Sequence, residues 1–465
     1  MKVMSWIDKI ASKLPEVVGP KQKRLSFKEK LKWTLIVLVL FFTLRLIPLF
    51  GLGENALSTF EYLSIILGAE FGSILSLGIG PIVTASIVLQ LLNGSGILKF
   101  DLTDPEGRKN FQGLQKLMSL FFIIFEATIY VVMGGLAPSV MYAGTSAYVQ
   151  LQLILIFQLI LGGVLIMFMD EVVSKWGFGS GISMFIAAGV SQTIFVGALS
   201  WLPSPTNPDL ATGAIPAIFQ SLNIGDPQTA ALKIATLVST VAVFALAVYA
   251  QAMKVEIPLS FGRVRGYGMR WPLSFIYTSN IPVILVAALI ANVQLWARLL
   301  QNWGYPLLGT FVGQSPASGL VFWLHSPDLV GKLIRGSITY IDVLQSFTYI
   351  GFMILGAVVF SCFWVQTAGM DAQSQAKQIM ASGLQIPGFR KDQRVLERIL
   401  NRYIWPLTVM GGIAVGILAA VADLTGSLSR GTGILLAVMI IYKLYEEIAK
   451  QHMVDMHPMM RKIME

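Results

Sequence analysis

The stretch of sequence that decides the fold is SILSLGIGPIVTASIVLQLL, which runs from Ser73 to Leu92 without a charged side chain. A membrane-spanning helix needs about 20 predominantly apolar residues. The whole chain has the same character, because 55% of its 465 residues are hydrophobic and only 13% are charged. Roughly a quarter of the residues in a soluble domain are charged. The sequence therefore predicts an all-α membrane protein that crosses the bilayer several times.

Similar apolar runs recur along the chain and predict ten transmembrane helices. They are expected at residues 33–50, 73–93, 112–134, 148–169, 182–201, 231–252, 273–296, 344–367, 404–421 and 431–448. The last is the weakest of the ten, since its apolar part is short before Lys443. The first run starts past residue 30 and is too long for the apolar region of a signal peptide.

Lysine and arginine are distributed unequally between the two sides of the membrane that ten spans define. The side that includes both termini carries twenty-eight of them, nine before the first span, and the opposite side with its membrane edge carries six. Basic residues accumulate in cytosolic segments. We therefore expect both termini in the cytosol, and we interpret the net charge of +9 as a topology signal rather than a nucleic-acid footprint.

Four segments do not fit a simple helical bundle. Residues 3–14 have apolar side chains on one helical face, which favours a helix on the cytosolic membrane surface, with a frayed tail as the alternative. Residues 55–70 are helical in pattern but too short to span, so they form either a re-entrant half-helix buried in protein or an external cap. Residues 253–272 and 370–403 are too polar for the membrane and are predicted as cytosolic loops.

The second and seventh spans share a weak sequence echo. Pro81 leads to Gln90 and Leu91 in one, and Pro282 leads to Gln294 and Leu295 in the other. Because five spans separate them, the two helices would run in opposite directions. An inverted repeat of this kind places a site or pore between two halves, although the residues alone leave coincidence open.

The motifs of common enzymes are missing from the sequence, which has no GxxxxGK[ST], no HExxH and no GxSxG. The glycine run Gly177–Gly181 lacks the preceding strand that a nucleotide loop requires. It is predicted to be a tight hairpin with a helix cap. Cys362 is the only cysteine, and the three histidines have no metal-site spacing. We expect no enzymatic activity, no cofactor and no metal.

Glu126 is the only carboxylate well inside the predicted spans. A charge in hydrocarbon is costly and persists for function. This side chain could serve a proton-coupled carrier, or it could hydrogen-bond to Thr84, Ser86 or Asn292 in other spans. An inverted-repeat secondary transporter of a small solute is therefore the alternative function.

Two stretches, Ser73–Leu92 and Phe168–Ile186 (FMDEVVSKWGFGSGISMFI), closely resemble the signature segments of the SecY family, the channel subunit of the general protein translocase. Shorter matches occur at Gly262–Arg265, Ser279–Pro282, Pro387–Arg390 and Gly431–Gly433. The likeness runs from about residue 20 to the end of the chain and is greatest to archaeal members.

The resemblance implies two pseudo-symmetric, inverted five-helix halves, residues 1–225 and 226–465, around a central pore, with residues 55–70 as a re-entrant plug. It implies a channel in the cell membrane that passes unfolded polypeptides across and releases hydrophobic segments sideways into lipid. The expected partners are SecE-type and Sec-beta/SecG-type small subunits, the ribosome with its rRNA or another cytosolic targeting or motor partner, signal sequences, nascent polypeptides and the lipid bilayer.

The resemblance also assigns site residues. A pore ring of aliphatic side chains is expected at Ile79, Val83, Ile182, Ile186, Ile284 and Leu436. A polar cluster at the lateral gate is expected at Thr84, Glu126 and Asn292. The ribosome or another cytosolic partner is expected to dock at Arg263, Arg265, Arg390 and Lys391, since the planar fork of arginine suits phosphates.

Overall fold

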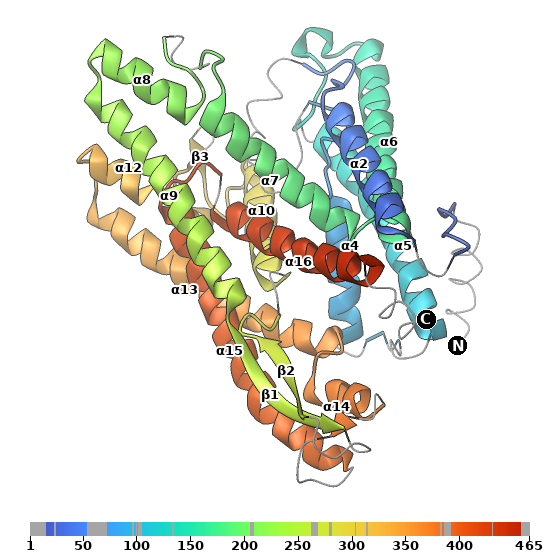
Figure 1. Cartoon of the computed structure of the whole chain (residues 1–465). Coiled ribbons are helices and arrows are strands. Elements are labelled where there is room, and N and C mark those ends of the chain that lie inside the picture. Colours follow the sequence, from blue (N-terminus) through green and yellow to red (C-terminus); the bar gives the residue numbers. More distant parts are fainter. Residues whose placement is uncertain are drawn as a thin grey trace.

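Helices dominate the computed structural model of the chain, and they form one bundle with a small sheet at one end (Figure 1). The structure describes residues 15–22, 25–53, 72–94, 97–98, 100, 105–132, 134–204, 209–261, 268–278, 281–302, 304–312, 315–381, 384–385, 392–429 and 431–456. The predicted surface helix at 3–14 and the predicted plug at 55–70 therefore lie outside the described residues.

A long helix occupies each of the ten predicted spans. These helices are α2 (Phe27–Arg45), α4 (Gly80–Gly94), α5 (Pro105–Val132), α6 (Ser146–Trp176), α7 (Gly181–Leu199), α9 (Pro227–Ala252), α10 (Ile281–Asn302), α13 (Tyr340–Thr367), α15 (Gln393–Leu424) and α16 (Gly431–Met456). Within the described part of the chain, seven of them are long and apolar enough to cross a membrane, and α4 has a shorter apolar part.

At least three of the predicted spans include non-helical backbone at one end. Helix α2 ends at Arg45, so residues 46–50 are not helical, and residues 73–79 form turns before α4 begins. The span predicted at 273–296 starts with two strand residues, 273–274, and a turn before α10. Pro81 is the second residue of α4, and the fixed φ of proline favours the first turn of a helix. Helix α10 starts in the same way with Pro282 in second place, so the sequence echo extends to the way both helices begin.

The prediction of loops at 253–272 and 370–403 is wrong in part. Strands β1 (Lys254–Phe261) and β2 (Gly268–Ser274) form an antiparallel hairpin, and β5 (Leu384–Gln385) pairs with the end of β1. Helix α14 (Ala372–Ala381) precedes β5. The signal for the hairpin was present, since polar and apolar residues alternate from Lys254 to Ile257, which is the period of a strand.

One end of the helical bundle carries the sheet, and the opposite end carries several short elements. The start of α2 and the end of α16 lie side by side, because Lys30 Nζ donates to Gln451 Oε1 over 2.9 Å. Lys254 of β1 pairs with Glu446 of α16 over 3.0 Å, which places the sheet on the same face. The opposite end carries short elements (Figure 1): η2 (Val140–Tyr142), α8 (Ala214–Ile224), β3 (Phe311–Val312), β4 (Ser315–Pro316), α11 (Leu320–Trp323) and α12 (Leu329–Ile334).

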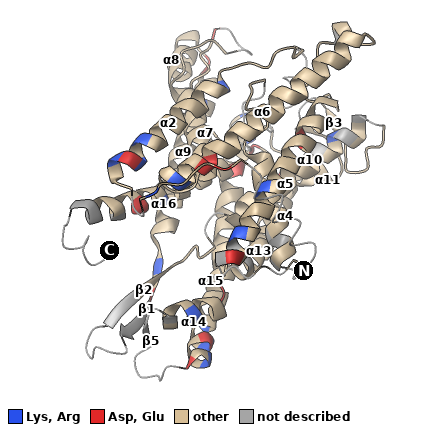
Figure 2. Ribbon diagram, turned by 90° about the vertical axis from the view of Figure 1, so that its right-hand side faces the viewer, with Lys and Arg blue, Asp and Glu red and all other residues tan. Residues whose placement is uncertain are grey.

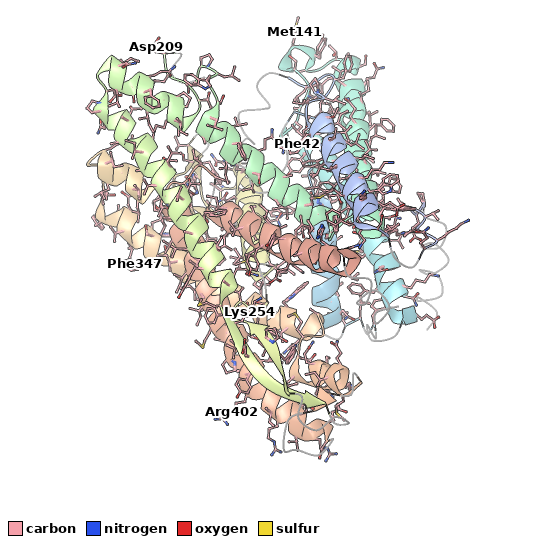
Figure 3. The ribbon with its side chains drawn as sticks, in the orientation of Figure 1. Phe42, Met141, Asp209, Lys254, Phe347 and Arg402 are labelled. Atoms are coloured by element: carbon pink, nitrogen blue, oxygen red, sulfur yellow. The ribbon has the colours of Figure 1, made fainter. Side chains whose placement is uncertain are left out.

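Apolar side chains cover the flanks of the bundle. Phe42 of α2 and Phe347 of α13 are 36% and 68% exposed, and both point outward from the long helices, whereas Lys254, Arg402 and Asp209 lie towards the two ends (Figure 3). An apolar belt between polar ends is the surface that a bilayer requires. This distribution supports the prediction of a protein that crosses the membrane several times.

Four apolar clusters hold the helices together. One lies in the second half around Met353, one in the first half around Leu155, and one around Leu400 fixes α14 and the end of β2 against the first turns of α15. The fourth is where the two halves meet, and it takes side chains from α2, α4, α6, α7, α10 and α16. This fourth cluster, which we call the central cluster, positions the candidate site.

The irregular stretch before α4 has its backbone groups paired, as an apolar environment demands. The N–H of Ile74 donates to the carbonyl of Ile47 over 3.0 Å, and the N–H of Leu49 donates to the carbonyl of Gly72 over 2.7 Å. The stretch also packs closely on α6, because a Cβ atom at Gly162 would lie 1.9 Å from the carbonyl oxygen of Ile74. Only glycine permits this approach.

We expect Gly162→Ala to destabilise the protein by about 1–3 kcal/mol, since the added methyl group meets backbone that cannot rotate away. Thermal unfolding of the purified protein in detergent measures the effect. Gly351→Ala in α13 is the matched control, because a Cβ atom there has nothing within 4 Å. Equal melting temperatures for the two variants would contradict the close packing of α6 on Ile74.

Candidate functional site

The six side chains predicted for the pore ring lie in the central cluster. Three are buried and three are partly buried against that cluster: Ile79, Ile186 and Leu436, and Val83, Ile182 and Ile284. They come from α4, α7, α10 and α16, so both halves of the chain contribute to the same apolar contact. The structure thus brings together residues that lie up to 357 positions apart in the sequence.

Pairs of ring residues in the first half lie one helical turn apart. The N–H of Val83 donates to the carbonyl of Ile79 over 3.1 Å, so Ile79 directly precedes α4 and shares its face. Ile182 and Ile186 have the same spacing in the first two turns of α7. Residues four apart project from one face of a helix, which lets each of these helices supply two side chains.

Helices α4 and α10 place their ring residues at matching positions. Val83 follows Pro81 by two residues, and Ile284 follows Pro282 by two residues. Both prolines are the second residue of their helix. The two helices are the second and seventh spans, which the sequence echo had already paired.

Helices α7 and α16 extend this correspondence to the fifth and tenth spans. Ile186 follows Gly181 by five residues, and Leu436 follows Gly431 by five residues. Both glycines are the first residue of their helix. The ring positions therefore repeat between the halves with the five-span offset of an inverted repeat.

Of the three residues predicted for the polar cluster, Thr84 on α4 and Glu126 on α5 lie near each other. The Thr84 hydroxyl donates to the carbonyl of Gly80 in its own helix over 2.9 Å. Asn292 on α10 is exposed and has no hydrogen-bond partner among the described residues. Ser86 does not bond to Glu126, because its hydroxyl donates to the carbonyl of Ile82 over 2.9 Å and accepts from Gln115 Nε2 over 2.6 Å. The bond between Gln115 and Ser86 therefore joins α5 to α4 within the first half.

The four predicted docking residues, Arg263, Arg265, Arg390 and Lys391, lie outside the described residues. Their flanks are described, and β1 pairs with β5 through Ser260 with Gln385 and through Phe261 with Leu384. Residues 262–267 follow β1 and residues 386–391 follow β5, so the two segments leave neighbouring strands of one sheet. Figure 2 shows further basic residues beside this sheet, on α14 and the first turns of α15.

The Gly177–Gly181 segment is a tight turn between α6 and α7, as predicted. Phe178 is buried, and its N–H donates to the Thr34 hydroxyl of α2 over 3.1 Å. Two carboxylates that were not predicted as site residues bind backbone N–H groups at turns of this kind. Asp170 of α6 accepts the N–H of Ile182 over 2.9 Å, and Asp423 of α15 accepts the N–H of Thr432 over 3.1 Å. The predicted spans ended at 169 and 421, just before these residues.

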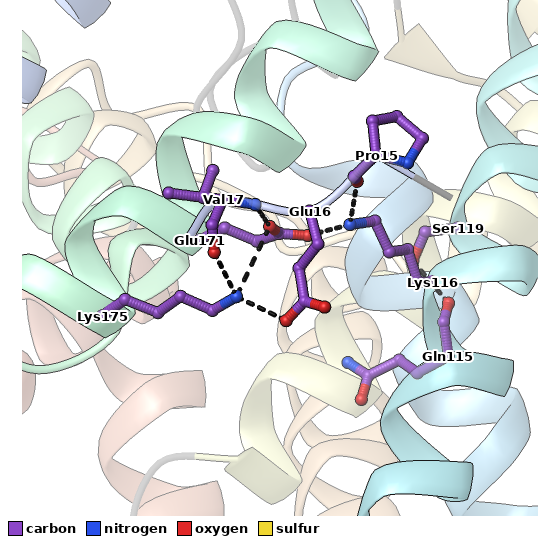
Figure 4. Close-up of polar contacts among 8 residues, drawn as sticks. All are labelled: Pro15, Glu16, Val17, Gln115, Lys116, Ser119, Glu171 and Lys175. Atoms are coloured by element: carbon purple, nitrogen blue, oxygen red, sulfur yellow. Dashed lines mark hydrogen bonds and ion pairs between the residues drawn. The ribbon is translucent and has the colours of Figure 1, made fainter. Parts of the chain in front are cut away.

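Residues 15–18 lie across the ends of α5 and α6 and form a strap that polar contacts hold in place (Figure 4). Lys116 of α5 donates to the carbonyl of Pro15 over 2.6 Å and forms an ion pair with Glu171 of α6. Glu171 also accepts the N–H of Val17 over 2.9 Å. The Trp176 indole donates to the carbonyl of Val18 over 2.9 Å.

Lys175 completes the contacts of the strap. Its ammonium group donates to the carbonyl of Val17 over 2.6 Å and pairs with Glu16 over 2.5 Å. The hydrogen bond and the positive charge of Lys175 hold the pKa of Glu16 below its usual range. The strap therefore ties the N-terminal segment to α6 and, through Lys116, to α5. No group of three or more metal-binding side chains occurs in the described part of the chain.

Three comparisons with known proteins agree with one another. A family model described as SecY matches residues 73–445. The protein translocase subunit SecY of Methanothermobacter thermautotrophicus is 47% identical over 457 residues, which are 97% of each chain. A solved structure of a protein conducting channel has a TM-score of 0.81 at 42% identity and covers 97% of this chain and 98% of its own. Sec61 in the canine ribosome-channel complex from the endoplasmic reticulum has a TM-score of 0.78, also at 42% identity, with the same coverage of both chains.

We expect Glu171→Ala to release the strap, because it removes the acceptor of the Val17 N–H and the partner of Lys116. Trypsin should then cut after the exposed Lys21 several-fold faster than in the unmodified protein. Glu106→Ala serves as the control, since Glu106 is exposed in the first turn of α5, away from the strap. An unchanged cleavage rate in Glu171→Ala would contradict the anchoring role of this carboxylate.

Proposed function

The chain belongs to the SecY family, and on this premise we propose that it is the channel subunit of a protein translocase. It passes unfolded polypeptides across the membrane and releases hydrophobic segments into the bilayer. The observation that carries the proposal is that four helices from both halves bring six aliphatic side chains into one cluster. The chain itself supplies no enzymatic chemistry, so a partner drives transport.

An apolar constriction suits a channel for polypeptides of any sequence. Aliphatic side chains have no fixed hydrogen-bonding pattern, so they can close around many different segments. When the constriction is empty, it resists ions because water leaves a narrow apolar passage. We propose that Ile79, Val83, Ile182, Ile186, Ile284 and Leu436 form this ring, and that residues 55–70 block the outer funnel as a plug until a substrate arrives.

The two halves, residues 1–225 and 226–465, are proposed to separate when the channel opens. Gly225 adopts a φ of 83°, and Asp226 is the N-cap of α9, so the chain turns sharply at this boundary. The lateral opening is proposed to lie on the side of α4 and α5, where Thr84 and Glu126 lie near each other, with Asn292 of α10 as the third member of the polar cluster. The hydrogen bond from Gln115 to Ser86 joins α5 to α4 on this side of the gate.

The cytosolic face is proposed to be the face with the sheet, the start of α2 and the end of α16. This orientation puts both termini and the basic segments in the cytosol, as the charge asymmetry predicts. We propose that Arg263, Arg265, Arg390 and Lys391 bind rRNA or another cytosolic partner on this face. One similar structure was solved in a ribosome-channel complex, which supports this role. SecE-type and Sec-beta/SecG-type small subunits complete the proposed assembly.

A secondary transporter of a small solute is not supported. The relatives with the same length and fold are translocase subunits and protein-conducting channels. The transporter alternative therefore has no observation in its favour.

A photocrosslinker placed at Ile79 or Ile284 should capture a secretory nascent chain that is stalled in the membrane. The side chains of a ring contact every translocating segment, whereas a lipid-facing side chain contacts none. The same crosslinker at Phe244, which is 52% exposed on α9, is the matched control and should capture lipid only. Capture at Phe244 without capture at either ring position would contradict the pore assignment.

Glu126→Gln should shift the ease with which the channel opens, because it changes the one carboxyl group of the polar cluster at the proposed lateral gate and preserves the volume of the side chain. Intramembrane hydrogen bonds contribute about 0.6 kcal/mol on average, so export of a substrate with a weakened signal sequence should change by about three-fold at most. Thr128→Val is the control, since that hydroxyl only donates to the carbonyl of Ile124 in its own helix. Loss of a pH-driven solute uptake in Glu126→Gln would instead favour a carrier.

A further inference from the structure

Two aspartates occupy corresponding positions in the two halves of the chain. Asp170 lies near the end of α6 and Asp423 near the end of α15, which are the fourth and ninth spans. Each carboxylate reaches across the following turn and binds the start of the next helix. The next helices, α7 and α16, are two of the four helices that carry the ring.

The first contact caps the N-terminus of α7. Ser180 occupies the N-cap position but makes no capping hydrogen bond with its side chain. The carboxylate of Asp170 takes this role instead, since it accepts the N–H of Ile182 over 2.9 Å. The approach is close, because a Cβ atom at Gly181 would lie 2.6 Å from the Cα atom of Asp170.

The second contact repeats this arrangement at α16. Asp423 accepts the N–H of Thr432 over 3.1 Å. Its other carboxylate oxygen accepts from the Tyr349 hydroxyl of α13 over 2.7 Å. A Cβ atom at Gly431 would lie 2.0 Å from the Cβ atom of Ala422, so this helix start is also pressed against the preceding helix.

Both contacts lie within one or two helical turns of a ring side chain. In α7 the capped N–H belongs to Ile182, which is itself a ring residue, and Ile186 follows one turn later. In α16 the capped N–H belongs to Thr432, and Leu436 follows one turn later. The carboxylates therefore fix the position of the ring side chains of these two helices along the axis of the preceding helix.

A remote cap of this kind differs from an ordinary N-cap. Asp392 precedes α15 directly and accepts the N–H of Arg394 over 2.9 Å, which stabilises the helix end wherever the helix lies. Asp170 and Asp423 belong to a different helix from the one they cap, so their bonds fix two helices relative to each other. The first N–H groups of a helix have no partner of their own, and a charged acceptor binds them strongly.

We infer that Asp170 and Asp423 are a symmetric pair of positioning residues that hold α7 and α16, and through them the ring, in the closed arrangement. The inference rests on the proposed function, because it assigns a role to these residues only if the ring seals the channel. They contact no substrate, and they act through the helix ends that they bind.

Chloride efflux from proteoliposomes that contain the full-length chain, followed with a chloride-sensitive dye, tests the pair. Asp170→Ala and Asp423→Ala should each raise the resting leak about ten-fold, which is the effect of losing one strong hydrogen bond on the closed population. Asp170→Asn and Asp423→Asn keep one acceptor oxygen, so their leak should lie between those of the unmodified protein and the alanine variants. If an alanine variant does not fold, the leak of the asparagine variant at the same position provides the test.

Asp392→Ala is the matched control, because it removes an N-cap from a spanning helix that carries no ring residue. It should lower the melting temperature without raising the leak. A leak in Asp392→Ala as large as in the other two would overturn the inference, because general destabilisation would then explain the effect.

Ile186→Gly and Leu436→Gly separate this inference from the proposed function. If these ring variants leak and the aspartate variants do not, the positioning role is wrong and the ring stands. If the ring variants do not leak, the proposed seal is wrong, and the role of the aspartates is overturned with it.

Discussion

The packing of two halves against each other at the central cluster is the constraint on which the rest of the structure depends. Four helices must each place an aliphatic side chain in the same contact, and this contact crosses the boundary between the halves. Apolar contact in a membrane is not driven by the exclusion of water, since lipid is as apolar as leucine. Close packing and well-placed polar contacts must therefore hold these helices, and both are found next to the cluster.

Close packing depends on small residues where irregular backbone meets a helix. The turns before α4 carry Ile79 into the cluster, and they can approach α6 only because Gly162 has no side chain. Their backbone groups pair with the segment after α2, which meets the demand for satisfied polar groups at membrane depth. The polar contacts repeat between the halves, since Asp170 and Asp423 bind the starts of two helices that carry the ring. Symmetry thus extends from the ring residues to the groups that position them.

The face with the sheet is organised by a different kind of interaction. The apolar cluster around Leu400 packs α14 and the end of β2 on α15. This packing fixes the sheet against a long helix. Ion pairs and backbone contacts fix the strap on α5 and α6. Salt screens exposed pairs of this type more than the buried contacts of the bundle. Salt is therefore expected to loosen the strap more than it loosens the packing of α14 and β2 on α15.

The sequence by itself determined the membrane class, the number of long helices and the grouping of the ring residues. Hydrophobic length is a local property that each span carries alone, and the resemblance predicted, residue by residue, the six aliphatic side chains that the structure groups in the central cluster. The strands at 254–274 were missed, although their alternation was visible, because polarity and length favoured a loop. Only the tertiary structure decided that Ser86 binds Gln115 and not Glu126, and that Asp170 and Asp423 cap helices other than their own. Such partners are set by how helices pack against one another, and no spacing within a single span records that geometry.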